Sequence, residues 1–527
     1  MSTIAATAVA TSQPRASTRE WIAVLAGMIG AFMAILNIQI TNASLLDIEG
    51  GIGTGVDNGA WISTSYLIGE IVVIPLTAYF SSVFSFRRYI LVNSILFPLF
   101  SIACAFAHDL GTMILLRGLQ GFAGGVLIPM AFTMVLTKLP KPQQPLGLAI
   151  FALSVTFAPA IGPTIGGYLT ENYGWQTIFF INAIPSAVMA VALAMTLDKQ
   201  PMQLRLLREG DWAGIFTMAI GLSALQTVLE EGNKEDWFSS SFIVKLSILA
   251  FVFLAAFIWI ELTVKKPLVK LSLLTQRNFG IGVAVNVLVG VALFGTVYIL
   301  PQYLGQVQRY NAEQIGMVLA WTGLPQLLLI PLVPMMMKRF DARYIGFLGI
   351  SIFAISCFMN VTLSADTAGD QFWIPNIVRA IGQALVLTPI TAITTAGIAA
   401  TDAAAASGLT NMLRNLGGAV GTATLGTVLT KREQFHSNII GQSVTLSRDE
   451  VRDRLAQTTG YFMQHGISDP AVAGQKAVVV LGQIVRRQAL ILGFADTFAV
   501  IGVVLAIAAV ALLLTQKPRS GAGAGAH

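Results

Sequence analysis

Charged residues are scarce in this sequence. Only 11% of its 527 residues are Asp, Glu, Lys or Arg, and 55% are hydrophobic, whereas a soluble globular protein carries about 25% charged residues. A chain with so few charges cannot cover a water-facing surface, so its solvent has to be lipid. The net charge of +6 does not indicate nucleic acid as a partner, because the basic residues lie between hydrophobic runs, where they orient membrane helices.

Residues that bind metals or take part in catalysis are also rare. Both cysteines, Cys104 and Cys357, fall inside hydrophobic runs, and we expect buried free thiols because there is no CxxC pattern. The four histidines are scattered without an HExxH motif, and no Walker motif indicates a fused ATPase. We therefore expect no metal and no cofactor. The sequence shows no compact set of nucleophile, base and ligands for an intramembrane enzyme.

Long hydrophobic runs dominate the sequence instead. A helix needs about 20 apolar residues to cross the hydrocarbon core, and open strands cannot cross it because their backbone groups stay unpaired. The sequence therefore predicts an all-α polytopic membrane protein with fourteen transmembrane helices. The predicted spans cover residues 21–46, 57–83, 88–107, 110–137, 146–170, 175–197, 212–230, 240–263, 278–305, 312–337, 344–363, 372–397, 408–430 and 489–514.

The distribution of Lys and Arg between the runs predicts the orientation, because cytoplasmic loops carry an excess of basic residues. With the N-terminus inside, the cytoplasmic segments hold nearly all basic residues of the short loops, and the short outer loops hold only Lys234 and Arg309. We therefore expect both termini in the cytoplasm, with tails at 1–20 and 515–527. Residues 1–20 lack the apolar core of a cleaved signal peptide.

Residues 431–488 form the longest polar stretch between two runs. The stretch carries several basic residues, yet the number of preceding spans puts it outside, and long loops cross largely regardless of charge. Residues 447–464 and 470–488 have compositions compatible with helices. We expect a long periplasmic loop that forms a hairpin or a partner surface, with a merely solvated loop as the alternative.

The fourth run contains an arginine inside the membrane. It reads Arg117-Gly-Leu-Gln120-Gly121-Phe-Ala-Gly-Gly125. An arginine within a span is costly and has to face a cavity or a partner. Glycines four residues apart allow two helices to approach closely, so we expect tight packing next to Arg117.

The fifth run is rich in proline and glycine, with Gly162-Pro163-Thr-Ile-Gly166-Gly167 in its second half. A proline removes a backbone hydrogen bond and kinks a helix, and the glycines make a flat, closely packed face. We expect a kinked, tightly packed helix that suits a gate between two moving halves. Ordinary packing of a span is the alternative.

The first run carries amide side chains. Asn37, Gln39 and Asn42 lie within it, and we expect them to form a polar cavity together with Gln120. An amide forms hydrogen bonds but cannot release a proton. If protons are coupled to transport, another residue has to carry them.

Glu70 is the candidate for proton coupling, because it lies near the middle of the second run. An intramembrane carboxylate indicates function by default. We predict that Glu70 exchanges the proton and that Arg117 tunes it. The alternative is that Glu70 is a fixed structural partner of Arg117.

The C-terminal half repeats part of this arrangement. Arg379 and Arg414 are embedded there, and Pro389 follows Arg379 as Pro129 follows Arg117, which indicates weak internal symmetry between two halves. The basic pair Arg87 and Arg88 follows the second run, and we expect it in a cytoplasmic loop.

These segments together resemble the motifs of the major facilitator superfamily, in its drug:proton antiporter branch with fourteen spans (the EmrB/QacA subfamily). The fourth run is similar to RxxQGxxxG and the fifth to the antiporter motif GPxxGG. The sequence departs from the family at two places. Asn37 stands where the aspartate of LDxTIVNVALP is expected, and Ser82 stands at the aspartate position of GxLaDRxGRR, of which the pair Arg87 and Arg88 remains.

The resemblance implies two six-helix bundles at 21–197 and 278–514, with two extra helices at 198–277. It implies a proton-coupled antiporter that exports amphipathic organic compounds across the bacterial inner membrane by alternating access. Relatives work with a periplasmic adaptor and an outer-membrane channel, for which 431–488 is the expected contact. The alternatives are export of one endogenous metabolite, fatty acid or siderophore, proton-coupled uptake, and a membrane subunit without a transport role.

Overall fold

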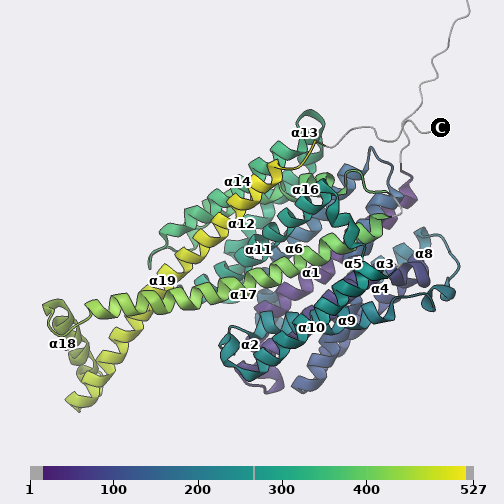
Figure 1. The fold of residues 1–527 in the computed structure, drawn as a ribbon. Helices are drawn as coiled ribbons and strands as arrows, with labels where there is room; N and C mark the ends of the chain where they lie inside the picture. The colour runs from purple at the N-terminus through teal and green to yellow at the C-terminus, as the bar shows by residue number, and fades with distance from the viewer. Residues whose placement is uncertain (1–15, 265–266, 400–401, 518–527) are drawn as a thin grey trace, which may run out of the picture.

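The protein is described here by a computed structural model that covers residues 16–264, 267–399 and 402–517, so most of the two predicted tails lies outside the described residues. Within these ranges the chain is almost entirely helical and contains no β-strand (Figure 1). The predicted all-α fold class is confirmed. Both cysteines are buried free thiols, as the sequence predicts.

An N-terminal group of helices is arranged around α1 and α5. Helix α1 packs against α5, α6 and α8, while α3 and α4 both pack against α5. A capping box between Ser17 and Glu20 begins α1. The group consists of α1 (Thr18–Ala43), α2 (Leu45–Ile52), α3 (Val56–Val83), α4 (Phe86–Cys104), α5 (Leu110–Lys138), α6 (Gln144–Tyr173), α7 (Thr177–Phe180) and α8 (Ala183–Thr196).

A C-terminal group is arranged around α11 and α19. Helix α11 packs against α17 and α19, and α14 packs against α15 and α19. The group consists of α11 (Arg277–Gln306), α12 (Ala312–Leu329), α13 (Val333–Arg339), α14 (Ala342–Met359), α15 (Trp373–Ala384), α16 (Leu387–Thr395), α17 (Ala403–Ser443), α18 (Asp449–Gln464) and α19 (Pro470–Leu513).

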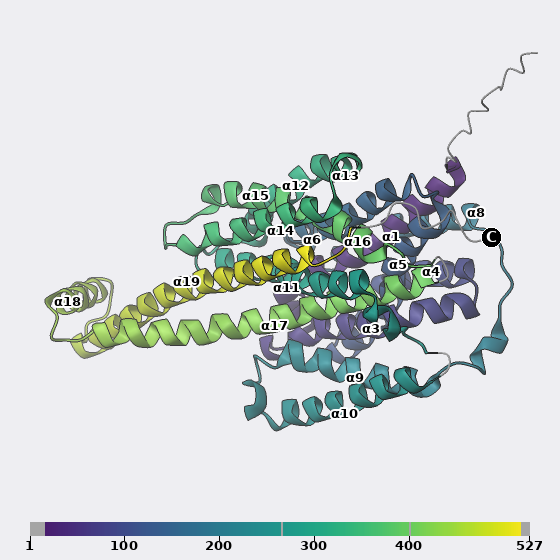
Figure 2. The same cartoon turned by 45° about the horizontal axis from the view of Figure 1, so that its top comes forward.

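Two further helices, α9 (Trp212–Glu231) and α10 (Ser241–Thr263), form an extra pair between the groups in the chain. They pack against each other, and α9 also contacts α3 and α17 (Figure 2). Short 3-10 helices fill several of the connections: η1 (Leu204–Leu207), η2 (Trp237–Ser239), η3 (Leu271–Thr275), η4 (Ile330–Leu332), η5 (Asn360–Thr362) and η6 (Gly369–Gln371).

Twelve helices of the described chain are long and apolar enough to cross a membrane, and α6 makes thirteen if its two parts, bent by 44°, form one span. The predicted span 408–430 lies in α17, which runs beside α11. Helix α17 does not meet the same apolar criterion, because Asn411, Arg414 and Asn415 lower its hydropathy. The count of fourteen spans therefore stays a prediction.

The predicted loop at 431–488 is mostly helical. Helix α17 continues to Ser443, α18 follows, and α19 begins at Pro470, so the two long helices extend past the other helices and carry α18 at their tip (Figure 1). The predicted helices near 447–464 and 470–488 are confirmed. The loop prediction was wrong for 431–443, because the polar residues that end the hydrophobic run there do not end the helix.

The molecule has two distinct sides. The start of α1 and the end of α19 lie opposite α18 (Figures 1 and 2), and we call these the terminal side and the hairpin side. On the terminal side, Arg19 pairs with Asp198 at 2.9 Å, and Arg343 donates to the Thr515 carbonyl at 3.1 Å. That the terminal side faces the cytoplasm stays a prediction.

Apolar contacts close the region between the two groups toward the terminal side. One cluster joins Ile74 of α3 and Met218 of α9 with Phe279 of α11 and Leu409 of α17. A second joins Ala149 of α6 with Ile330 and Ala384. Lys270 and Asp402 form an ion pair. In the sequence, both residues lie close to members of the first cluster, such as Val269 and Ala406.

Candidate functional site

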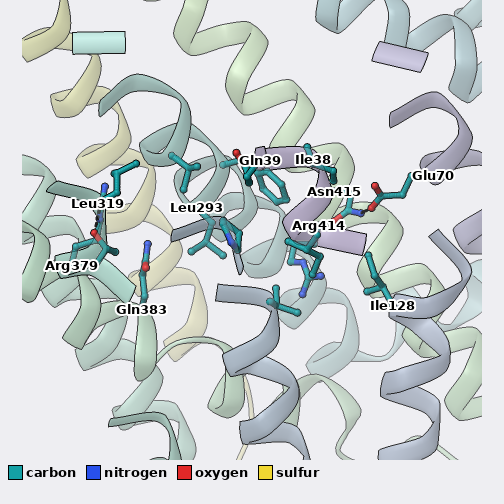
Figure 3. A pocket seen from close by; sticks show the side chains of 16 residues that line it. Ile38, Gln39, Glu70, Ile128, Leu293, Leu319, Arg379, Gln383, Arg414 and Asn415 are labelled. Carbon is teal, nitrogen blue, oxygen red and sulfur yellow. Dashed lines mark hydrogen bonds between the residues drawn. The ribbon is translucent and has the colours of Figure 1, made fainter. Parts of the chain in front are cut away.

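A cavity of about 620 Å³ lies between the two groups in the hairpin half of the molecule. Its walls come from α1, α3, α9, α11 and α17, and its polar lining includes Gln39, Asn42, Glu70 and Asn415. A smaller cavity of about 40 Å³ adjoins it and shares Gln39, Glu70 and Asn415 with it. Figure 3 shows that Arg379, Gln383 and Arg414 also line this smaller cavity. The two cavities adjoin each other between the groups, and both have a partly polar lining.

Glu70 connects the N-terminal group to the C-terminal group. It lies in the middle of α3, and its Oε1 accepts a hydrogen bond from Asn415 Nδ2 of α17 at 3.0 Å (Figure 3). Its side chain is buried, and Oε2 has no hydrogen-bond partner. Gly125 of α5 makes room for this part of α3, since a Cβ on Gly125 would lie 2.9 Å from the Cα of Glu70.

Arg117 does not pair with Glu70 within the described residues. Its Nη1 donates to Asn37 Oδ1 at 2.5 Å and to Gln120 Oε1 at 2.8 Å, and its guanidinium lies 4.4 Å from the centre of the Tyr66 ring. The alternative that Glu70 is a fixed structural partner of Arg117 is therefore not observed. Arg117 is held by neutral acceptors and an aromatic face, which satisfy a buried cation without cancelling its charge.

The four amides predicted to line one polar cavity separate into two sets. Gln39 and Asn42 line the larger cavity. Asn37 and Gln120 line neither of the two cavities and bind Arg117 instead. The sequence placed three of these amides in the first run and Gln120 in the fourth, but only the fold determines which side of each helix faces the cavities.

The motif segment of α6 packs against α1 of its own group and against α12 of the C-terminal group. A Cβ on Gly162 would lie 2.5 Å from Gln39 Cβ, and a Cβ on Gly166 would lie 2.9 Å from the Ile40 carbonyl oxygen, so both glycines allow α6 to approach α1. On another side of α6, Thr164 lies against Gly316 of α12. Pro163 lines the larger cavity, and Gly167 is buried in the same segment.

The C-terminal arginines lie in the smaller cavity. Arg414 donates to Asn411 Oδ1 at 2.8 Å, and Arg379 donates to the Thr322 hydroxyl. Neither forms an ion pair among the described residues, and both line the cavity that also contains Glu70. Two cations and one carboxylate therefore share one buried polar region, where charges interact more strongly than they do in water.

Arg87 and Arg88 lie away from this region. They begin α4 on the terminal side, where Arg87 donates to the Ala194 carbonyl at 2.8 Å. They do not line either cavity. Their position is that of a short connection between two membrane helices, in which basic residues orient the chain.

Two residues of the site did not stand out in the sequence. Asn415 comes from a helix 345 residues away from Glu70, so no local pattern joins them. Glu230 lines the larger cavity from the end of α9, where the sequence Glu-Glu-Gly-Asn-Lys reads as the start of a polar loop.

Comparisons with known proteins agree with this architecture. The profile of the family described as Major Facilitator Superfamily matches residues 27–422. The chain is 32% identical to the colistin resistance protein EmrB of Acinetobacter baumannii, over 93% of this chain and 95% of that protein. It is 31% identical to the multidrug export protein EmrB of Escherichia coli, over 96% of each chain, and 30% identical to the fatty acid resistance protein FarB of Neisseria gonorrhoeae, over 96% and 98%.

A solved structure has the same fold. The proton:xylose symporter XylE superposes with a TM-score of 0.57 at 12% identity, and the match covers 94% of this chain and 95% of that one. The chain belongs to the Major Facilitator Superfamily. Within that superfamily it groups with the EmrB-type exporters, and the resemblance inferred from the sequence motifs is confirmed. Family and fold are those of multi-pass membrane transporters.

Proposed function

We propose that the protein exports amphipathic organic compounds across the bacterial inner membrane in exchange for protons, by alternating access. One observation carries the proposal: a buried carboxylate, Glu70, lies in the central cavity and bonds across the two groups to Asn415. A carboxylate in that position can couple its protonation to the contact between the groups. Names of similar proteins, which refer to multidrug export and to colistin resistance, support the substrate class.

Protonation of Glu70 would change the contact between α3 and α17. The ionised carboxylate accepts the Asn415 amide and lies near the Arg414 guanidinium in the same cavity. Adding a proton removes the negative charge that attracts Arg414 and weakens the hydrogen bond from Asn415. A substrate that binds only while Glu70 is deprotonated would then compete with a proton for Glu70. Such competition is the basis of antiport.

The arrangement of cavities and apolar clusters supports alternating access. The larger cavity lies in the hairpin half, while the clusters around Leu409 and Ile330 close the terminal half. We propose that this is the state open toward the periplasm. Rocking of the groups would open the terminal side, with α6 and α12 sliding along the contact between Thr164 and Gly316 as part of the gate.

The helical hairpin formed by the ends of α17 and α19 with α18 suits a periplasmic partner. Its exposed large apolar side chains include Phe435, Ile439 and Val478. We propose that a periplasmic adaptor, leading to an outer-membrane channel, contacts this hairpin.

Export of one fatty acid or another endogenous acid is a second candidate function. The smaller cavity contains Arg379 and Arg414, whose side chains bond to neutral acceptors and form no ion pair among the described residues. An organic carboxylate would pair with either guanidinium. The relative FarB is named for fatty acid resistance. Binding of a weak acid that Arg379→Gln abolishes would favour this candidate.

Substrate-induced proton release tests the main proposal. Native protein and Glu70→Gln are compared in energised everted membrane vesicles, with lipophilic cations, weak organic acids and detergents as probes. We expect some probes to discharge the pH gradient with native protein and none to do so with Glu70→Gln. Glu171→Gln, which changes an exposed glutamate at the hairpin end of α6, is the control and should behave like native protein.

Two other outcomes have separate meanings. If a probe discharges the pH gradient with both native protein and Glu70→Gln, the protein is an antiporter but Glu70 is not its proton carrier. If no probe discharges the gradient with folded native protein, proton-coupled export of these compounds is rejected.

A further inference from the structure

The larger cavity has an acidic lining. Among the described residues that line it, the charged ones are Glu70 of α3 and Glu230 of α9, and neither lysine nor arginine contributes. The two carboxylates come from different parts of the fold, the N-terminal group and the extra pair. The basic side chains Arg379 and Arg414 lie instead in the smaller cavity. The charged lining of the larger cavity therefore consists of carboxylates, and the guanidinium groups lie further in, beside Glu70.

Glu230 faces the cavity without a cation beside it. Its Oε1 accepts a hydrogen bond from Gln226 Nε2 at 3.0 Å, and both side chains line the cavity. No lysine or arginine in the described part of the chain forms an ion pair with it. An amide donor orients a carboxylate but brings no positive charge, so the Glu230 carboxylate stays open to a cation in the cavity.

The neighbouring Glu231 differs in each of these respects. It is only 2% exposed, pairs with Lys234 at 3.5 Å and accepts a hydrogen bond from Thr64 Oγ1 at 3.2 Å. It does not line the cavity. Two adjacent glutamates at the same depth thus have different roles: one is neutralised within the protein, and the other is available to a ligand.

The cavity also contains a buried polar atom without a partner and an aromatic wall. Glu70 is only 3% exposed and lines both cavities, and its Oε2 accepts no hydrogen bond. Phe294 and Tyr298 of α11 line the larger cavity together with apolar residues such as Leu67 and Val297. Aromatic faces attract organic cations, and an apolar wall binds the rest of an amphipathic molecule.

We propose that Glu230 is a specificity-determining residue that binds the positively charged group of an amphipathic substrate in the larger cavity. The proposal rests on the export function proposed above and narrows its substrates to those with a quaternary ammonium, phosphonium or protonated amine group. A cation gains from Glu230 and Glu70 together, while an anion of equal size is repelled by both. It also gives the extra pair a role, because α9 supplies a wall of the transport path.

A matched pair of probes tests this inference. Tetraphenylphosphonium and tetraphenylborate have nearly the same shape and opposite charges. Binding of each to the purified full chain in lipid nanodiscs is measured at constant pH by titration, with empty nanodiscs subtracted. The variants are Glu230→Gln, Glu230→Asp and, as the matched control, Glu231→Gln.

We expect Glu230→Gln to raise the dissociation constant of tetraphenylphosphonium about tenfold. Binding of tetraphenylborate should stay the same or become tighter, which also shows that the variant is folded. Glu230→Asp should restore most of the phosphonium affinity, and Glu231→Gln should bind both probes like native protein.

The contrary results separate this inference from the proposed function. If Glu230→Gln binds the phosphonium as native protein does, or loses affinity for both probes equally, Glu230 does not determine specificity. Export of amphipathic compounds is not contradicted by either result. If native protein binds the borate but not the phosphonium, the role of Glu230 is likewise overturned and the proposed export function is not. Native protein that binds neither probe overturns the inference and the proposed function together.

Discussion

At the scale of single residues, Arg117 shows how a buried cation is held by neutral groups. Its Nη1 binds Asn37 and Gln120, its Nη2 has no hydrogen-bond partner, and the Asn37 amide nitrogen is likewise unpaired. A buried charge without an opposite partner costs stability. The asparagine at position 37 therefore leaves part of this cost in place.

Replacing Asn37 by aspartate should stabilise the protein. The new carboxylate would accept from both terminal nitrogens of Arg117, and such a two-bonded pair is stronger than a single bond to an amide. We expect Asn37→Asp to raise the melting temperature in detergent, by a gain of about 1–2 kcal/mol. Asn37→Ala, which removes the acceptor, should lower it. A fall in melting temperature for Asn37→Asp would contradict this account of Arg117.

The sequence identified much of the site but not its contacts. Glu70, Gln39, Asn42 and Arg414 were predicted as site residues and lie in the cavities. Polar residues inside a membrane span are costly and occur mainly where they have a function. Their presence within a hydrophobic run was therefore enough to identify them as candidates. The bond from Asn415 to Glu70 depends on the packing of α17 against α3, and no spacing within one helix contains that information.

At the scale of helices, the contact between α3 and α5 depends on glycine. A Cβ on Gly121 would lie 2.0 Å from the Tyr66 carbonyl oxygen, whereas a Cβ on Gly118 would lie 3.7 Å from the Ser65 carbonyl oxygen. The sequence pattern predicted close packing here, and the structure shows which glycines it requires. Because Glu70 and Tyr66 both lie on α3, this packing also sets the position of the site.

Gly121→Ala and Gly118→Ala form a matched test of this contact. The methyl group on residue 121 would meet backbone atoms that cannot move without shifting α3, so we expect a loss of about 1–3 kcal/mol and reduced transport. The methyl group on residue 118 would make ordinary contacts, and Gly118→Ala should stay within about 0.5 kcal/mol of native protein. Melting temperature and initial transport rate are the measurements. Equal effects of the two changes would show that α3 does not approach α5 as closely as described.

The sequence was less informative about helix ends than about helix positions. Each hydrophobic run predicted a span that falls on one helix or on two or more consecutive helices of the structure. Hydropathy marks only the part of a helix that lies in lipid. Helices α17 and α19 continue into polar sequence because a helix needs only its own backbone hydrogen bonds. The run from Lys431 to Ser443 is the example, since its composition changes while its backbone geometry does not.

At the scale of the whole molecule, α17 passes from the apolar cluster of the terminal half to the larger cavity of the hairpin half. Leu409 is buried in the apolar cluster near the terminal side, and Thr422 lines the larger cavity. Both native cysteines are buried, so the protein offers a low background for labelling of introduced thiols.

Labelling of Thr422→Cys and Leu409→Cys with a membrane-impermeant maleimide should therefore differ. In intact cells we expect Thr422→Cys to react and Leu409→Cys to stay unreacted. In everted membranes, Leu409→Cys should react only when substrate and a proton gradient drive the opposite state. Rapid reaction of Leu409→Cys in intact cells would contradict the proposal that the terminal half is closed. Reaction of Thr422→Cys only in everted membranes would show that the hairpin side, and not the terminal side, faces the cytoplasm.

The hairpin gives the molecule a mechanical property of its own. Helix α17 has 41 residues, which corresponds to a rod about 60 Å long, and one part of this rod lines the cavity while the other carries α18. Each degree by which the rod tilts moves its tip by about 1 Å. The tip is therefore displaced further than the part of α17 that lines the cavity. A partner bound to the tip would oppose the tilting of α17 and so slow any conformational change that depends on it.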